Sequence, residues 1–214
     1  EIHTIKVDVS RAGKYIALFR YVSKATIKNL RVVGSIHNTA TWSGNSGSDY
    51  DLNRFTAGLV GVCELGTVIQ NCVISVTIIS DITGDNNYGN KGDGSHGGIV
   101  GYVTSATTSE NRIKIENCLF NGKLLGPKTY SCAGFVGAGY SDSQICEIRN
   151  CLFAPTEVTM LSDGSATFSR CHLYNNAVFY SYYTKAFGTV QGADQSGSSA
   201  SNIVELLNGN QNPG

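Results

Sequence analysis

The sequence predicts an all-β protein: a right-handed single-stranded parallel β-helix, or solenoid, with irregular loops and a short C-terminal capping helix. The first observation is a repeated motif, in which a Gly-flanked apolar run precedes a segment that ends in Asn-Cys. Repetition at this scale is typical of solenoids. Clear copies begin at Gly58, Gly98 and Gly134, a looser copy begins at Ala17, and a frayed copy begins at Ala166.

Two further observations favour this fold. The repeated runs are short, rich in Val and Ile, and separated by small polar residues, as strands are. The repeat length varies, because the marker residues Asn29, Asn71, Asn117 and Asn150 stand 42, 46 and 33 residues apart. A solenoid tolerates this variation, since extra residues leave each coil as a loop, and we expect roughly four to five coils. The right hand follows from the general rule for parallel crossovers.

The N-terminal residues predict four strands. Alternating apolar and polar residues indicate a strand over 2–9, and a second strand is expected over 15–22 after a turn over 10–13. Two shorter runs, over 26–30 and 31–36, complete this first coil.

Each later copy contains three strand-like segments, which in the clearest copy cover 58–62, 68–72 and 73–79. Most extra length follows the third segment, and 104–112 separates the first two segments of its copy. We expect loops that leave after the same strand to gather on one side of the stack. The predicted loops after the third segment are 37–54, 81–97, 126–131 and 155–165.

The C-terminal residues predict a boundary between a repeat domain over 1–190 and a tail over 191–214. The tail begins with a Gly- and Ser-rich connector, and a short helix over 201–209 follows, with Ser201 as its N-cap. A lone short helix is marginal by itself, so we expect it to close the open end of the solenoid with Ile203, Leu206 and Leu207.

Composition excludes several classes of function. Lys plus Arg and Asp plus Glu both number 16, so charge gives no bias toward nucleic acid or an anionic membrane. The sequence contains no run of about 18 apolar residues, so it predicts no membrane-spanning helix. Because the chain starts with a strand-like pattern and without Met, we expect it to be a piece of a longer protein with other domains, and no signal peptide is recognised.

The cysteines suggest packing more than cross-linking. Cys72, Cys118 and Cys151 follow the marker asparagines at the position where the first copy has Leu30. A position that accepts Cys or Leu is an apolar core position, so we expect buried thiols, with disulfides as the alternative. A pair between Cys132 and Cys146 stays open, and the spacing gives no zinc motif.

The column of asparagines also has a structural interpretation. At equivalent corners of stacked coils, neighbouring Asn side chains would lie about 4.8 Å apart, so each amide can donate to the next. We therefore expect Asn29, Asn71, Asn117 and Asn150 to be structural; the alternative is a row of ligand contacts.

The copies that contain Gly58-Leu59-Val60-Gly61 and Gly98-Ile99-Val100-Gly101, each followed by Ile-x-Asn-Cys, resemble the GLUG repeats of bacterial surface and secreted proteins. His3-Thr4-Ile5 before Ala17-Leu18-Phe19 also resembles the start of such arrays. The resemblance covers roughly residues 3–180 and implies a parallel β-helix, an extracellular or cell-surface location and no catalytic residue. Arg20 and Ser169 depart from the pattern, where the motif has its second Gly.

No catalytic or metal site stands out. Acidic residues do not recur at one repeat position, which argues against the paired carboxylates of a polysaccharide-cleaving enzyme. Asp85, Asn87 and Asp93 could ligate calcium, but their spacing is not that of an EF-hand and no closing Glu follows, so a flexible polar loop is the alternative. We expect no other cofactor. The default for the histidines is solvent exposure: His3, His37, His96 and His172.

The aromatic residues of the loops give the main indication of function. Trp42, Tyr50, Tyr88 and Tyr130 follow third segments and stand near Asn, Asp, Ser and Gly, a combination that suits sugar rings. The alternative is that they cover the flank of the solenoid. The sequence thus predicts a non-catalytic module that binds a polysaccharide or a host-surface ligand. A structural spacer is the second hypothesis, and a polysaccharide-degrading enzyme is the third.

Overall fold

The computed structural model describes residues 1–40, 54–64, 66–82, 94–103, 113–127, 131–139, 146–149, 151–153, 155–159 and 171–173. This part of the chain consists of strands, turns and bends, and none of its residues lies in a helix. The all-β prediction is therefore confirmed for the described residues. The predicted connector and helix of residues 191–214 lie outside them.

The strands form four sheets of parallel pairs. Sheet A contains β1 (His3–Arg11), β5 (Leu30–Asn38), β9 (Val73–Ser80), β13 (Leu119–Phe120), β14 (Lys123–Leu125), β18 (Leu152–Phe153) and β19 (Glu157–Val158). Sheet B contains β2 (Tyr15–Ile16), β6 (Arg54–Ala57), β10 (Gly94–Gly97) and β15 (Ser131–Ala133). Sheet C contains β3 (Phe19–Val22), β7 (Val60–Cys63), β11 (Val100–Val103) and β16 (Val136–Gly139). Sheet D contains β4 (Thr26–Lys28), β8 (Val68–Gln70), β12 (Ile113–Glu116), β17 (Cys146–Arg149) and β20 (Cys171–Leu173).

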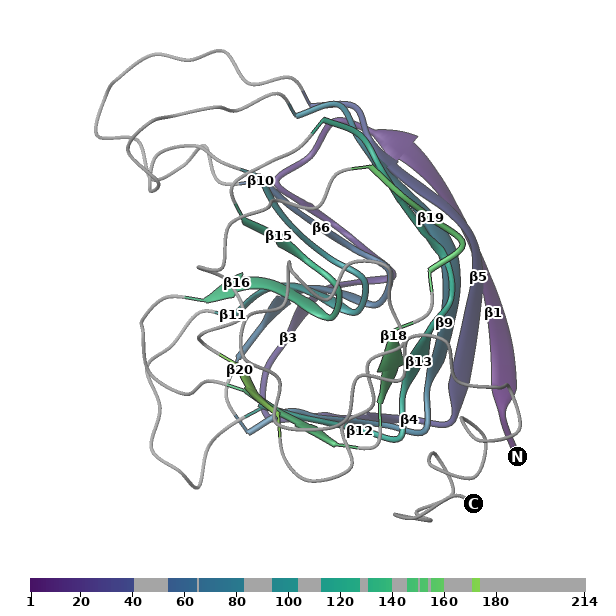
Figure 1. Cartoon of the computed structure of the whole chain (residues 1–214), viewed down its shortest axis with the longest axis vertical. Helices are drawn as coiled ribbons and strands as arrows, with labels where there is room; N and C mark the ends of the chain where they lie inside the picture. Colours follow the sequence, from purple (N-terminus) through teal and green to yellow (C-terminus); the bar gives the residue numbers. More distant parts are fainter. Residues whose placement is uncertain are drawn as a thin grey trace.

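The chain visits sheets A, B, C and D in the same order in successive repeats, and the sheets surround a common interior (Figure 1). Equivalent residues of successive repeats stand opposite each other, such as Val32 and Ile74 in sheet A, or Ile69 and Ile115 in sheet D. Parallel sheets visited in turn are compatible with the predicted β-helix.

In the copies that contain Gly58, Gly98 and Gly134, a strand of sheet B precedes the three segments that the sequence predicts, and the third segment of the copy at Gly98 divides into β13 and β14. β6 begins at the last residue of the expected loop 37–54, and β10 lies within the expected loop 81–97. The β10 sequence, Gly-Ser-His-Gly, has no apolar alternation, and the β6 sequence, Arg-Phe-Thr-Ala, is only four residues long. They are strands because they pair with each other in parallel, from Gly94 opposite Arg54 to Gly97 opposite Ala57, so tertiary pairing overrides local propensity.

Inward-facing side chains form columns that run through the stack. The rings of Phe120 and Phe153 stack with centroids 5.4 Å apart, and Phe135 meets Phe153 edge-on at 5.8 Å. Full burial of one Ile side chain stabilises a fold by about 2 kcal/mol. The inward column of sheet D shows this repetition most clearly, with Ile27, Ile69, Ile115 and Ile148.

The motif glycines permit close approach of the chain at the corner between sheets B and C. A Cβ atom on Gly98 would lie 2.3 Å from the carbonyl oxygen of Gly134 and 2.8 Å from the ring of Phe120. On Gly101 it would lie 2.7 Å from the carbonyl oxygen of Gly61. Any side chain at these two positions would displace the neighbouring backbone, so sterics explain why both positions of the motif are glycine.

Arg20 replaces the second motif glycine at the edge of the stack. It lies on β3, between residues that pair with Val60 and Val62, and thus opposite Gly61. Its guanidinium lies 5.5 Å from the ring centroid of Tyr15, a cation–π geometry. Ser169, the other departure, lies outside the described residues.

The cysteine column lies in the core. Cys72, Cys118 and Cys151 are free thiols with no exposed surface, and Cys63 is also free and buried. The Cys118 thiol donates to the carbonyl oxygen of Glu116 at 3.1 Å. Burial raises the pKa of the Cys118 thiol well above its usual value. The remaining cysteines lie in β15, β17 and β20, with side chains outside the described part: Cys132, Cys146 and Cys171.

Candidate functional site

The long segments that carry the predicted ligand-binding residues are attached at one corner, between sheets A and B. β5 and β9 end beside each other, at Asn38 and Ser80, and β6 and β10 begin beside each other. Segments 41–53 and 83–93 are therefore attached at neighbouring positions of the stack. We call this region the A/B corner.

The residues predicted to bind ligands lie outside the described residues, so they stay predictions. Trp42 and Tyr50 belong to segment 41–53, Tyr88 belongs to segment 83–93, and Tyr130 precedes β15. The calcium candidates also fall in segment 83–93: Asp85, Asn87 and Asp93.

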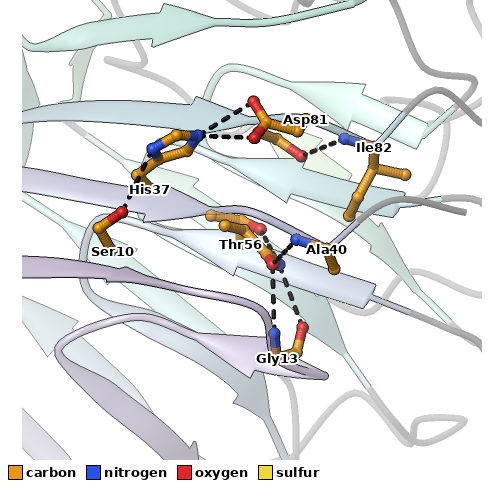
Figure 2. A network of polar contacts seen from close by, with 9 residues as sticks. Ser10, Gly13, His37, Ala40, Thr56, Asp81 and Ile82 are labelled. Atoms are coloured by element: carbon orange, nitrogen blue, oxygen red, sulfur yellow. Dashed lines mark hydrogen bonds and ion pairs between the residues drawn. The ribbon is translucent and has the colours of Figure 1, made fainter.

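A row of polar side chains lies beside these attachment points (Figure 2). His37, on β5, has its Nε2 atom 3.0 Å from both carboxylate oxygens of Asp81, the residue after β9. Its Nδ1 atom lies 3.4 Å from the hydroxyl of Ser10 on β1. The side chains of His37 and Asp81 are 29% and 45% exposed. The row crosses three successive strands of sheet A and is open to solvent.

Ser10, His37 and Asp81 do not have the geometry of a catalytic triad. In a triad, the carboxylate holds Nδ1 of the imidazole and Nε2 faces the nucleophile, whereas here the two nitrogens are exchanged. The contact of 3.4 Å is also longer than the ~2.6–3.2 Å expected between a nucleophile and its base. The arrangement is a surface polar row, in which an exposed ion pair contributes about 1 kcal/mol at most.

Asn38 fixes the inner side of the A/B corner. Its buried side-chain amide donates to Thr56 Oγ1 at 3.0 Å and to the carbonyl oxygen of Gly13 at 3.2 Å. Its Oδ1 atom accepts from the backbone N–H of Ala40 at 3.1 Å (Figure 2). Asn38 thus ties the end of β5 to β6 across the loop that joins them. Sequence reasoning missed this residue, although an Asn at the end of a strand is a common turn signal.

His96 contradicts the expectation of a solvated histidine. It lies on β10 with no exposed surface, opposite Thr56 on one side and Cys132 on the other. Neither ring nitrogen has a hydrogen-bond partner in the described part of the chain. Burial lowers the pKa of His96 to about 4, because the interior disfavours its charged form. His96 is a neutral core residue directly behind the A/B corner.

The asparagine column occupies the corner between sheets D and A. Nδ2 of Asn71 donates to Oδ1 of Asn29 at 3.1 Å, and Nδ2 of Asn117 donates to Oδ1 of Asn71 at 3.1 Å. All three have positive φ angles, 58°, 54° and 53° along the chain, a conformation that Asn tolerates better than most residues. The amides therefore bond one another from repeat to repeat. Asn150 lies outside the described residues.

No protein-family model matches the chain, and no curated protein or solved structure matches it. The resemblance to GLUG repeats therefore rests on the repeated residues alone. In the described ranges, His, Cys, Asp and Glu form no group of three or more that could hold a metal ion. The same ranges contain no helix with the length and hydrophobicity to cross a membrane.

Proposed function

We propose that the chain is a right-handed parallel β-helix of about four to five coils whose A/B corner is the functional face. The regular order of the four sheets supports this proposal, because the described strands of each repeat join the sheets in the same sequence, with two short strands in sheet A in the later repeats (β13 with β14, and β18 with β19). A single stack with one interior gives the attached loops a rigid base, and binding residues are common on loops held in this way.

The proposed function is adhesion or carbohydrate binding by a non-catalytic module of a bacterial surface or secreted protein. The observation that carries it is the attachment of segments 41–53 and 83–93 at neighbouring positions, beside the row of His37 and Asp81. Aromatic rings stack on sugar rings, and imidazole, carboxylate and amide groups bond the hydroxyls around them. In this proposal, the segments that carry the aromatic residues are attached beside the polar row at the A/B corner, on adjacent coils.

A structural spacer is the second candidate. The motif glycines, the cysteine column and the amide ladder are all engaged within the stack, which favours a role as a rigid element. An enzyme that degrades polysaccharide is less well supported, because no carboxylate pair recurs from coil to coil.

Native affinity electrophoresis against plant and mucosal polysaccharides tests the proposal, with product analysis of the same samples. We expect one class of glycan to retard the protein without new reducing ends or unsaturated products. Trp42→Ala and Tyr88→Ala should abolish the retardation and leave the unfolding midpoint unchanged. Tyr21→Ala is the matched control, because Tyr21 is a 51% exposed aromatic residue on sheet C.

The outcomes separate the three functions. Retardation that survives both variants would place the binding surface away from the A/B corner. No retardation by any glycan would favour the spacer or an adhesin that recognises protein. New reducing ends or unsaturated products would identify an enzyme.

A further inference from the structure

Buried polar side chains concentrate behind the A/B corner. The described residues include five of them, and four lie at this corner: Asn38, Thr56, Ser80 and His96. Asn38 and Ser80 stand opposite each other at the ends of β5 and β9, and Thr56 and His96 stand opposite each other on β6 and β10. Asn38 with Thr56, and Ser80 with His96, therefore form equivalent pairs in successive repeats, each across one connection from sheet A to sheet B.

The two pairs differ in their hydrogen bonds. Asn38 donates to Thr56 Oγ1 at 3.0 Å, so the first pair is joined (Figure 2). The second pair is not joined within the described part of the chain: Ser80 Oγ accepts from the backbone N–H of Ile82 at 3.3 Å, and neither ring nitrogen of His96 has a partner. A side-chain hydrogen bond thus closes the base of the first connection and not that of the second.

His96 is also the main side-chain anchor of β10. Ile16, Thr56 and His96 form one column of sheet B, and Ile16 belongs to the core, so His96 faces the interior. In the sequence Gly-Ser-His-Gly, His96 is the one residue with a side chain that the structure describes as buried. β10 is therefore held by its backbone pairing with β6 and β15 and by one imidazole, whose buried nitrogens are unsatisfied.

A proton on His96 would meet no carboxylate from the strands packed against β10, which are β6, β15, β11 and β16. The titratable residues of these four strands are Arg54, Tyr102 and Cys132. On the sheet A side of the corner, both carboxylate oxygens of Asp81 lie 3.0 Å from Nε2 of His37. An imidazolium at position 96 would thus be buried without a counter-charge, and burial accordingly lowers the pKa of His96 to about 4.

We propose that β10 is an acid-sensitive strand: a proton on His96 opens β10 locally, while sheet D keeps its pairing. The open strand exposes the imidazole to water and binds the proton that the folded strand rejects, so opening becomes more favourable as the pH falls. Under the proposed function, on which this consequence rests, acid would release the end of segment 83–93 from the A/B corner and weaken glycan binding.

Hydrogen exchange of the full chain near pH 7 and near pH 5 tests this proposal without any ligand. Protection factors are compared, because they correct for the effect of pH on the chemical exchange rate. The protection of the β10 amides should fall about twentyfold, since His96 has a pKa of about 4 in the folded strand and the usual 6.5 in the open one. The amides of β12, in sheet D of the same repeat, should keep their protection.

Two variants assign the effect to one histidine. His96→Asn should abolish the acid-dependent loss of protection in β10, because it removes the group that binds the proton. His37→Asn is the matched control: it removes the half-exposed histidine of the same corner and should leave the twentyfold loss unchanged. If His96→Asn does not fold, the comparison of β10 with β12 in wild type decides.

Three results would overturn the proposal: constant protection in β10, an equal loss in β10 and β12, or a loss that survives in His96→Asn. An equal loss would show that acid acts on the whole stack and not on this strand. Because no glycan enters the measurement, these results leave the proposed function to the retardation assay. Acid opening of β10 in a protein that no glycan retards would support this inference and not the proposed function.

Discussion

Two corners of the same stack differ in what the sequence repeats. At the corner between sheets D and A, each described copy turns with one Asn of positive φ, and the side chains of Asn29, Asn71 and Asn117 bond in series. At the A/B corner, Asn38 and Ser80 occupy equivalent positions, and segments of different length follow them. Residues that recur hold the repeats together, whereas under the proposed function the residues that do not recur are the ones available for binding.

The largest loss of stability is expected at a recurring glycine where there is no space for a side chain. Gly98→Ala should lower the free energy of unfolding by about 3 kcal/mol, because its Cβ would meet the Gly134 carbonyl oxygen at 2.3 Å. Urea unfolding measures this change. Gly66→Ala is the control: its φ of 73° costs about 1 kcal/mol, but its nearest contact is Lys24 Cγ at 3.6 Å. Equal losses of unfolding free energy in the two variants would show that the close approach of the Gly134 backbone does not explain the glycine at position 98.

The buried histidine behind the A/B corner predicts a pH effect of similar size. The folded-state pKa of His96 is about 4, below the usual 6.5, so the unfolded chain binds a proton that the folded chain does not. The free energy of unfolding is therefore unaffected by His96 above pH 6.5 and decreases as the pH drops toward 4. The total decrease amounts to roughly 3 kcal/mol at most. Urea unfolding near both ends of this range measures it.

His96→Asn should remove this part of the pH dependence, while other titrating groups keep theirs. His37→Asn is the control, since His37 is half-exposed and paired with Asp81. An identical pH profile for wild type and His96→Asn would contradict the buried neutral state of His96.

The amide ladder predicts a smaller loss. Asn71→Ala should destabilise the fold by about 2 kcal/mol, because Ala tolerates the φ of 54° poorly and loses two amide hydrogen bonds. Asn71→Gly keeps the backbone conformation accessible, so its smaller loss in chemical unfolding isolates the amide contribution. A ladder without energetic value would leave Asn71→Gly as stable as wild type.

The smallest effect is expected in the polar row of the A/B corner. Asp81→Asn removes the charge opposite His37 but keeps a polar group, and the pair is partly exposed. The free energy of unfolding should change by about 0.5 kcal/mol. The same variant should weaken glycan retardation in affinity electrophoresis if the row contacts the ligand. A loss above about 2 kcal/mol would instead make this row part of the framework.

The recurring residues explain what could be predicted from the sequence. Asn-Cys and the paired glycines repeat, and repetition places equivalent residues above one another in any stack. The strand β10 could not be predicted, since Gly-Ser-His-Gly has no strand pattern and is fixed by pairing with β6. For the same reason His96 resembles a loop histidine in the sequence but is buried.

The polar row shows a second limit. Ser10, His37 and Asp81 come from three different repeats, and their contacts depend on which residues pair between strands. Ser10 stands opposite His37, but Asp81 follows the end of β9 by one residue. A shift of one residue in either register would separate them, and the repeat motif does not specify register at this corner.

The contrast between the two corners is tested most directly by comparing Trp42→Ala with Asn71→Ala in two assays on the same samples. We predict that Trp42→Ala abolishes retardation by the bound glycan and leaves the free energy of unfolding unchanged. Asn71→Ala should lower that free energy and, at temperatures where it stays folded, keep the retardation of wild type. Loss of stability in Trp42→Ala, or full glycan retention by it, would contradict the assignment of function to the A/B corner.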